Sequence, residues 1–293
     1  MRDVTLKQLL EAGCHFGHQV TRQNPKAREF IFQAREGIHI IDLVKTREGL
    51  LSAAQFVHDT AVKGGTIIFV GTKRQARGIA VEAVKKAGGK EAGVFIVSER
   101  WVGGTLTNFD EVAKNYRKLK DLRLRLQSEE EKAKYTKKEV GGWEKERQKL
   151  ERFYGGVCEL EKLPDILFII DTHKEDQAAR EASRMGVAAV GIVDTNADPG
   201  LVDYAIPAND DAVGSIELIT NYIADAWIEG RKEKVQNEKL KVDGEAKQEK
   251  KVENAEEAEK QKRAATTKPK TKTSEKKEGK SGKRKSRAIK KAA

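Results

Sequence analysis

The sequence predicts an α/β protein organised around a parallel sheet, and two observations lead to this fold class. Four short apolar runs are separated by segments with helical spacing: TIIFVGT (66–72), VFIVSE (94–99), DILFIID (165–171) and AAVGIVDT (188–195). Strands that are apolar at every position are buried on both faces, which is typical of a parallel sheet flanked by helices. Asp171 and Asp194 end two of these runs. Both carboxylates are therefore expected at the carboxyl-terminal edge, where such sheets bind ligands.

The other elements of the α/β body follow from the apolar spacing along the chain. A short helix is expected over Thr5–Ala12, and Arg35-Glu36-Gly37 is expected to form a glycine turn between small strands at Phe30–Phe32 and Ile38–Leu43. In the longer segments, apolar residues recur every three or four positions. The remaining predicted elements are the helices Arg47–Val62, Arg74–Ala87, Lys174–Met185 and Ala212–Glu229, and the strand YAIP (204–207).

The alternation of strands and helices stops between residues 109 and 160. Two apolar series with helical spacing flank the polar segment SEEEKAKYTKKEVGG, and Arg123 and Glu146 interrupt them. This pattern predicts two antiparallel helices that pack as a coiled-coil arm inserted into the α/β body. The Lys and Arg residues on its outer faces indicate either a solvated surface or an RNA contact.

The positive charge of the chain is concentrated at its C-terminal end. From residue 231 onward there are 23 Lys and Arg against 11 Asp and Glu, so the net charge of +11 comes from this segment. Because it has almost no large apolar residues, it is expected to be disordered when free and to favour polyanions such as nucleic acid. The predicted organisation is an α/β body over 1–108 and 161–230, a coiled-coil insertion over 109–160 and a Lys-rich tail over 231–293.

The composition also restricts the class of protein. Cys14 and Cys158 are far apart and show no pairing pattern, which favours reduced thiols inside the cell. The N-terminus has no signal-like apolar stretch, and no segment approaches the roughly 20 apolar residues of a membrane span. We therefore expect a soluble cytoplasmic protein.

Two loops resemble phosphate cradles without matching a nucleotide motif. GTKRQA (71–76) follows a buried strand and opens a helix, while RWVGGTLTNF (100–109) follows the next strand. Neither contains the P-loop or the dinucleotide-binding pattern. Lys73 and Arg74 are unfavourable at a helix start unless an anion lies nearby, which indicates a phosphate; a solvated helix start is the alternative. Arg100 can bind phosphate, and Trp101 either stacks on a base or fills the core.

The remaining polar clusters leave several interpretations open. In CHFGHQ (14–19), no second ligand cluster completes a zinc site, so no metal is expected. His15 and His18 lie in a predicted loop close to Lys26 and Arg28, which suits RNA contact or a role in a turn. The acidic segments DTNADP (194–199) and NDD (209–211) favour turn and helix-cap roles over acid–base or Mg²⁺ chemistry.

Taken together, these motifs resemble one family. LLEAGCHFGHQ, NPK, REGIHIIDL, GTKRQA, RWVGGTLTNF, LPDILFIID, DTNADP and IPANDDAVGSI occur in the order found in the ribosomal protein S2 family of the bacterial small subunit, from about residue 3 to 230. The departures are Ala27 in place of a methionine, RWVGG for RWLGG, IPANDD for IPGNDD, and Gly214 in place of an arginine. The basic tail is also longer than in many members.

The resemblance implies a flavodoxin-like body with a two-helix arm, no catalytic activity, no cofactor and no homo-oligomer. It implies a structural role in the cytoplasmic small ribosomal subunit, contact with small-subunit ribosomal RNA and neighbouring proteins, and docking of ribosomal protein S1. The alternatives are a nucleotide-dependent α/β enzyme and a nonribosomal RNA-binding adaptor. Together with Arg28, the residues expected to contact RNA are His15, His18, Asn24, Lys26, Lys73, Arg74, Arg100, Trp101, Gly103, Gly104, Thr105 and Asn108.

Overall fold

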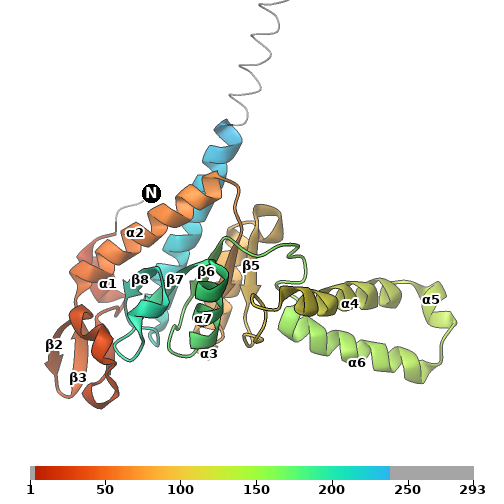
Figure 1. The fold of residues 1–293 in the computed structure, drawn as a ribbon, viewed down its shortest axis with the longest axis horizontal. Helices are drawn as coiled ribbons and strands as arrows, with labels where there is room; N and C mark the ends of the chain where they lie inside the picture. The colour runs from red at the N-terminus through yellow and green to blue at the C-terminus, as the bar shows by residue number, and fades with distance from the viewer. Residues whose placement is uncertain (1–3, 238–293) are drawn as a thin grey trace, which may run out of the picture. The chain divides into compact units, whose positions relative to one another are not determined.

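The large sheet of the protein is parallel and five-stranded, as the sequence predicts. The structure is a computed structural model that describes residues 4–237. The strand order is β5-β4-β6-β7-β8, and every neighbouring pair is parallel (Figure 1). The strands are β4 (Ile67–Val70), β5 (Val94–Val97), β6 (Ile166–Ile169), β7 (Ala188–Val193) and β8 (Tyr204–Pro207). Numbered within this sheet, the order is 2-1-3-4-5, which is the flavodoxin-like order.

Helices cover both faces of this sheet, so its central strands are buried on each side. Ile67 and Phe69 of β4 face one core, and Ile68 and Val70 face the other. The first core is closed by α2 (Leu43–Val62), α3 (Arg74–Lys86) and a helix over residues 213–237 that contains the fully buried Trp227. The second core is closed by α7 (Asp176–Met185) and the start of α4 (Phe109–Gln127).

A small antiparallel sheet near the N-terminus has three strands, one more than the sequence predicts. Its order is β1 (Phe16–Gln19), β3 (Ile38–Ile41) and β2 (Ile31–Arg35), and α1 (Leu6–Glu11) precedes it. The prediction of a loop at His18 is wrong, because this residue lies in β1. Gly17 permits the strand to form here, since an added Cβ would lie 2.7 Å from Thr195 Cγ2. Glu36 and Gly37 turn between β2 and β3 with φ values of 52° and 79°.

The segment between β5 and β6 folds as two helices packed against each other, α4 and α6 (Lys137–Tyr154), with the short α5 (Glu129–Ala133) between them (Figure 1). The two charges that interrupt the apolar pattern are paired across the helices. Arg123 bonds to Glu151 at 2.5 Å and 2.9 Å, and Glu146 pairs with Lys118. Charged residues at this interface therefore contribute ion pairs instead of breaking the packing.

The last helix continues through residue 237, past the predicted end at Glu229 and into the segment predicted as a tail. The rest of that predicted tail, 238–293, lies outside the described residues. Cys14 and Cys158 are both buried and free. Among residues 4–237, no helix combines the length and apolar character needed to span a bilayer. Four 3₁₀ turns complete the described elements: η1 (Val20–Arg22), η2 (Pro25–Phe30), η3 (Gly89–Ala92) and η4 (Pro199–Leu201).

Candidate functional site

The carboxyl-terminal edge of the large sheet contains a crevice of the kind that binds ligands in doubly wound folds. The chain order reverses between β4 and β6, and the loops that follow these two strands diverge at that point. The loop after β4 supplies Lys73, and Asp171 lies just beyond β6. The two side chains meet in the crevice, with Lys73 Nζ 2.9 Å from Asp171 Oδ2.

The ammonium group of Lys73 is surrounded by the protein's own carboxylates. Lys73 Nζ lies 2.7 Å from Asp210 Oδ1 and 2.8 Å from Asp211 Oδ1, and it donates to the Asp210 carbonyl at 3.2 Å. The anion that the sequence predicts beside Lys73 is thus an internal one and not a phosphate. We revise the predicted role of Lys73 from RNA contact to an internal ion pair, because its side chain is largely buried and already bonded.

Negative charge exceeds positive charge in this cluster. Asp171, Asp194 and Asp210 are all buried, and Asp211 is half-exposed. Burial, together with the charges of Asp171 and Asp194, raises the pKa of Asp210 to about 7. Burial opposes the charge of Lys73, but the surrounding aspartates prevail and raise its pKa. Both acidic segments have the predicted cap roles. Asn209 Oδ1 accepts from the amides of Asp211 and Ala212 at the start of the last helix, and Asp198 Oδ1 accepts from the Gly200 amide at the start of η4.

His18 joins the same cluster from the small sheet. Its Nδ1 is 3.1 Å from Asp194 Oδ1, and its Nε2 is 3.4 Å from Asp211 Oδ2. The Asp194 carboxylate is the main cause that raises the pKa of His18, against the opposing effect of burial. The sequence places His18 176 positions before Asp194 and 193 positions before Asp211, so no local pattern could reveal that it meets them.

The second phosphate-like loop, 100–109, is organised by the buried carboxylate of Glu181 on α7. This carboxylate accepts five hydrogen bonds, and the donors are Trp101 Nε1 at 3.2 Å, Gly104 N at 2.8 Å, Leu106 N at 3.1 Å, and Thr107 N and Oγ1 at 3.3 Å each. Burial opposes its charge, but these hydrogen bonds prevail and lower the pKa of Glu181. Glu181 therefore takes the place that a bound phosphate would have.

Three residues of this loop consequently have structural roles, contrary to the predicted direct contacts. Trp101 is buried in the core and donates to Glu181, so its ring is not available to stack on a base. The Gly104 amide also donates to Glu181, and Gly104 adopts a φ of 89°. Thr105 is buried and donates to the Val102 carbonyl. Arg100, Gly103 and Asn108 remain exposed.

Two arginines bond to Glu99 at the β5 end of the edge. Arg77 of α3 bonds to Glu99 at 2.8 Å, and Arg152 of α6 bonds to it at 3.0 Å. Arg100 follows Glu99 directly, and Arg74 lies one helical turn before Arg77. We call Arg74, Arg77, Arg100 and Arg152 the arginine group. Arg77 and Arg152 could not be found from the sequence, because only the fold brings α3 and the base of the arm to the same carboxylate.

Of the other predicted contacts, Asn24 and Lys26 bond to the segment that follows β7, and His15 lies beside the small sheet. Asn24 caps η2 by accepting from the Lys26 amide at 3.0 Å, and Lys26 Nζ bonds to Asp198 at 2.7 Å. Arg28 is exposed. His15 is half-buried against Phe16, with ring centroids 4.0 Å apart, and burial lowers its pKa.

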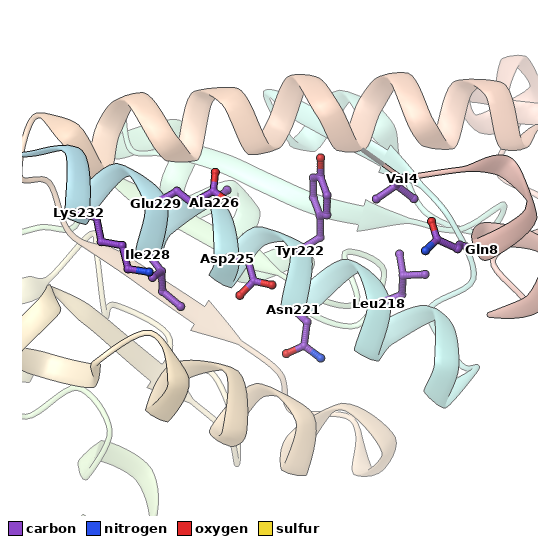
Figure 2. Close-up of a pocket in the computed structure, with 10 residues that line it drawn as sticks. All are labelled: Val4, Gln8, Leu218, Asn221, Tyr222, Asp225, Ala226, Ile228, Glu229 and Lys232. Carbon is purple, nitrogen blue, oxygen red and sulfur yellow. The ribbon is translucent and has the colours of Figure 1, made fainter. Parts of the chain in front are cut away.

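A further hollow of about 340 Å³ lies between the N-terminal segment and the last helix (Figure 2). Its lining side chains do not converge on one point; Tyr222 and Asn221 point to opposite sides of the helix. Asp225 in this lining is already paired with Lys86 at 2.5 Å. This hollow offers no constellation of polar groups comparable to that at the sheet edge.

The comparisons with known proteins agree with the motifs found in the sequence. A family model described as ribosomal protein S2 matches residues 9–230. The chain belongs to the ribosomal protein S2 family. It is 51% identical over 232 residues to the small ribosomal subunit protein uS2 of Coprothermobacter proteolyticus, covering 79% of this chain and 84% of that protein. It is 47% identical over 245 residues to the small ribosomal subunit protein uS2 of Geotalea uraniireducens, covering 84% and 93% respectively.

Membership of the S2 family confirms the resemblance found in the sequence and identifies the chain as a ribosomal protein. The family match includes the two helices between β5 and β6, and it ends at residue 230, before most of the basic segment. The acidic cluster and the Glu181 loop both lie within the matched residues.

Proposed function

We propose that this chain is a non-catalytic structural constituent of the cytoplasmic small ribosomal subunit, where it binds small-subunit ribosomal RNA. The observation that supports this proposal most strongly is the arginine group at the carboxyl-terminal edge, in a member of the S2 family. Two guanidinium groups, those of Arg77 and Arg152, bond to Glu99 there, and the exposed residues Arg74 and Arg100 lie close to these partners along the chain. Arginine binds phosphate oxygens through two parallel hydrogen bonds, so this group suits an RNA backbone.

The internal charged groups that occupy the two phosphate-like loops support a role other than nucleotide catalysis. Lys73 fills the crevice between β4 and β6, and Glu181 uses the backbone amides of the loop that follows β5. A nucleotide phosphate would have to displace an internal charge at either place. The proposed RNA contacts are the half-buried Arg77 and the exposed residues Lys26, Arg28, Arg74, Arg100, Gly103, Asn108 and Arg152.

The test compares charge reversal at the two edges of the sheet. In the full chain, Arg100→Glu is expected to weaken binding to small-subunit ribosomal RNA by about tenfold and to reduce the salt slope by roughly one phosphate contact. Arg184→Glu is the matched control, because Arg184 is an exposed arginine at the far end of α7, before β7 begins. Filter binding at several salt concentrations measures both. Equal affinities for the two variants would exclude Arg100 from the contact surface.

We also propose that the chain supports the docking of ribosomal protein S1. The small sheet and α1 expose several apolar side chains, and Phe32 is the most exposed of them at 69%. Exposed apolar patches of this kind mark protein-binding surfaces. Phe32→Ser is expected to reduce capture of ribosomal protein S1, whereas Leu124→Ser, at an equally exposed position on α4, is expected to leave it unchanged.

The alternative function is that of an RNA-binding adaptor outside the ribosome, which the same arginine group would also serve. Sedimentation of a cell extract separates the two. The ribosomal proposal requires the protein to migrate with the small subunit and to leave that fraction when the subunit is dissociated. Migration as a free protein at normal expression levels would favour the adaptor.

A further inference from the structure

Two exposed carboxamides lie against the paired glycines of the loop that follows β5. Gln177 of α7 lies over Gly103, because a Cβ added to this glycine would be 2.3 Å from Gln177 Nε2. Asn108 lies against Gly104, with its Cβ 3.4 Å from the position of an added Cβ. Asn108 and Gln177 are both exposed. The fold therefore brings two carboxamides from separate helices to neighbouring positions of one turn.

The side chain of Asn108 is not used by the helix that it precedes. Asn108 is the N-cap of α4, and an asparagine at this position ordinarily accepts a hydrogen bond from an amide of the first helical turn. Here the side chain makes no capping hydrogen bond, and Asp110 and Glu111 supply the negative charge that favours the helix start. The Asn108 carboxamide thus has no hydrogen-bond partner among residues 4–237.

The Gln177 carboxamide is also without a hydrogen-bond partner in the described part of the chain. It lies across Gly103 in the first turn of α7, and this is possible only because glycine has no Cβ. Any larger residue at position 103 would displace the carboxamide from the turn. Gly103 therefore permits a position of Gln177 that no internal hydrogen bond requires.

The chemistry of these two groups matches a nucleobase better than a phosphate. A carboxamide is uncharged and carries both donors and an acceptor. The edge of a base presents donors and acceptors side by side, and asparagine and glutamine bond to it through two parallel hydrogen bonds. A phosphate offers acceptors alone, so it would leave each carboxamide oxygen unused, and the arginines of this edge suit it better.

The surroundings of the turn also suit a single unpaired base. Proteins recognise RNA sequence mainly at unpaired bases, which stack on aromatic rings or on arginine planes. Trp101 is buried and cannot serve, but the exposed Arg100 lies three residues before Gly103 and can provide such a plane. The two glycines allow a base to approach the backbone closely.

We propose that Asn108 and Gln177 recognise the edge of an unpaired RNA base at the 103–104 turn, next to Arg100. This inference rests on the proposed RNA-binding function and adds the means by which the chain distinguishes one RNA sequence from another. The arginine group supplies affinity through phosphate contacts, which carry no sequence information. The two carboxamides supply the sequence preference.

The experiment measures filter binding of the full chain to small-subunit ribosomal RNA and to bulk transfer RNA at several salt concentrations. Asn108→Ala and Gln177→Ala are each expected to weaken binding to the ribosomal RNA about tenfold, with unchanged affinity for transfer RNA and an unchanged salt slope. Arg100→Glu should instead weaken binding to both RNAs and reduce the slope. Gln33→Ala is the matched control, since Gln33 of β2 is an exposed glutamine without a side-chain partner among the described residues.

A second variant tests the role of the turn itself. Gly103→Ala should displace Gln177 and reproduce the loss seen in Gln177→Ala. The urea midpoint of Asn108→Ala should equal that of the wild-type chain, because no cap is lost. A clearly lower midpoint would assign a capping role to Asn108 and overturn the inference.

The inference and the proposed function fail in different ways. If the wild-type chain binds ribosomal RNA but the double variant Asn108→Ala/Gln177→Ala keeps its preference over transfer RNA, only the base-recognition role is refuted. An equal loss of affinity for both RNAs would also refute it. If the wild-type chain binds neither RNA, the proposed function itself is wrong, and the inference falls with it.

Discussion

The two phosphate-like regions of the sheet edge have opposite charge arrangements. Around Lys73, one internal cation lies among four carboxylates. Around Glu181, one internal anion receives five hydrogen bonds from the loop that follows β5. The Glu181 carboxylate is fully hydrogen-bonded within the protein and has a structural role, whereas the cluster around Lys73 retains more carboxylates than cations and an unpartnered oxygen of Asp210 among the described residues. The comparison shows that a glycine-bearing loop after a buried strand does not identify a ligand site until its internal partners are known.

The largest loss of stability is expected from removing the Glu181 carboxylate. Glu181→Ala leaves the buried donors of Trp101, Gly104 and Leu106 without an acceptor, and each such donor costs about 1–3 kcal/mol. We expect the free energy of unfolding, measured in urea, to fall by about 4 kcal/mol. Glu82→Ala, at an exposed position of α3, should change it by less than about 0.5 kcal/mol. A loss below about 1 kcal/mol for Glu181→Ala would show that the loop does not depend on this carboxylate.

A smaller loss of stability is expected from removing the ammonium group of Lys73. Lys73→Met leaves Asp171 and Asp210 buried without their partner, which should cost about 3 kcal/mol in chelator-treated protein at neutral pH. Part of this cost is avoided because Asp210 can take up a proton. Arg74→Met is the neighbouring control, with an expected change within about 0.5 kcal/mol. The double variant Lys73→Met/Asp210→Asn should recover part of the stability, and a further loss would argue against charge imbalance as the cause.

The smallest expected effect is a pH dependence of stability. It appears when the unfolding free energy of the wild-type chain is compared with that of Glu181→Gln, in which the charge is removed. The pKa of Glu181 is lowered by its hydrogen bonds, so it lies below the unfolded value of about 4.3. Its stabilisation is therefore complete above that value and is lost as the pH falls through the folded-state pKa. The difference in unfolding free energy between the wild-type chain and Glu181→Gln should stay constant from pH 7 to about pH 5 and shrink below pH 4. A difference that is unchanged down to pH 3 would contradict the assignment.

Most of the fold could be predicted because it depends on local apolar patterns. The four apolar runs became β4, β5, β6 and β7, and YAIP became β8. Strand β1 was missed because FGHQ has little apolar character, and it forms only where Gly17 lies against Thr195. The ends of the elements were predicted less accurately. The last helix, for example, continues to residue 237, past its predicted end at Glu229.

The candidate site could be predicted only in part, because its contacts join distant segments. The sequence placed Asp171 and Asp194 at the sheet edge and suggested an anion beside Lys73. It could not show that the anion comes from Asp210, 137 residues away, or that Glu181 reaches Trp101 across 80 residues. For Trp101, the core alternative considered in the sequence was the right one, and the base-stacking role is withdrawn.

The most direct test of this account is a calorimetric titration of the full chain with ATP and GTP in the presence of magnesium. If internal charges occupy both phosphate-like regions and the edge serves RNA, no saturable binding should occur up to about 1 mM nucleotide, while the same preparation binds small-subunit ribosomal RNA. A micromolar dissociation constant for either nucleotide, abolished by substitution of Lys73 but not of Arg100, would contradict the account and favour a nucleotide-dependent enzyme.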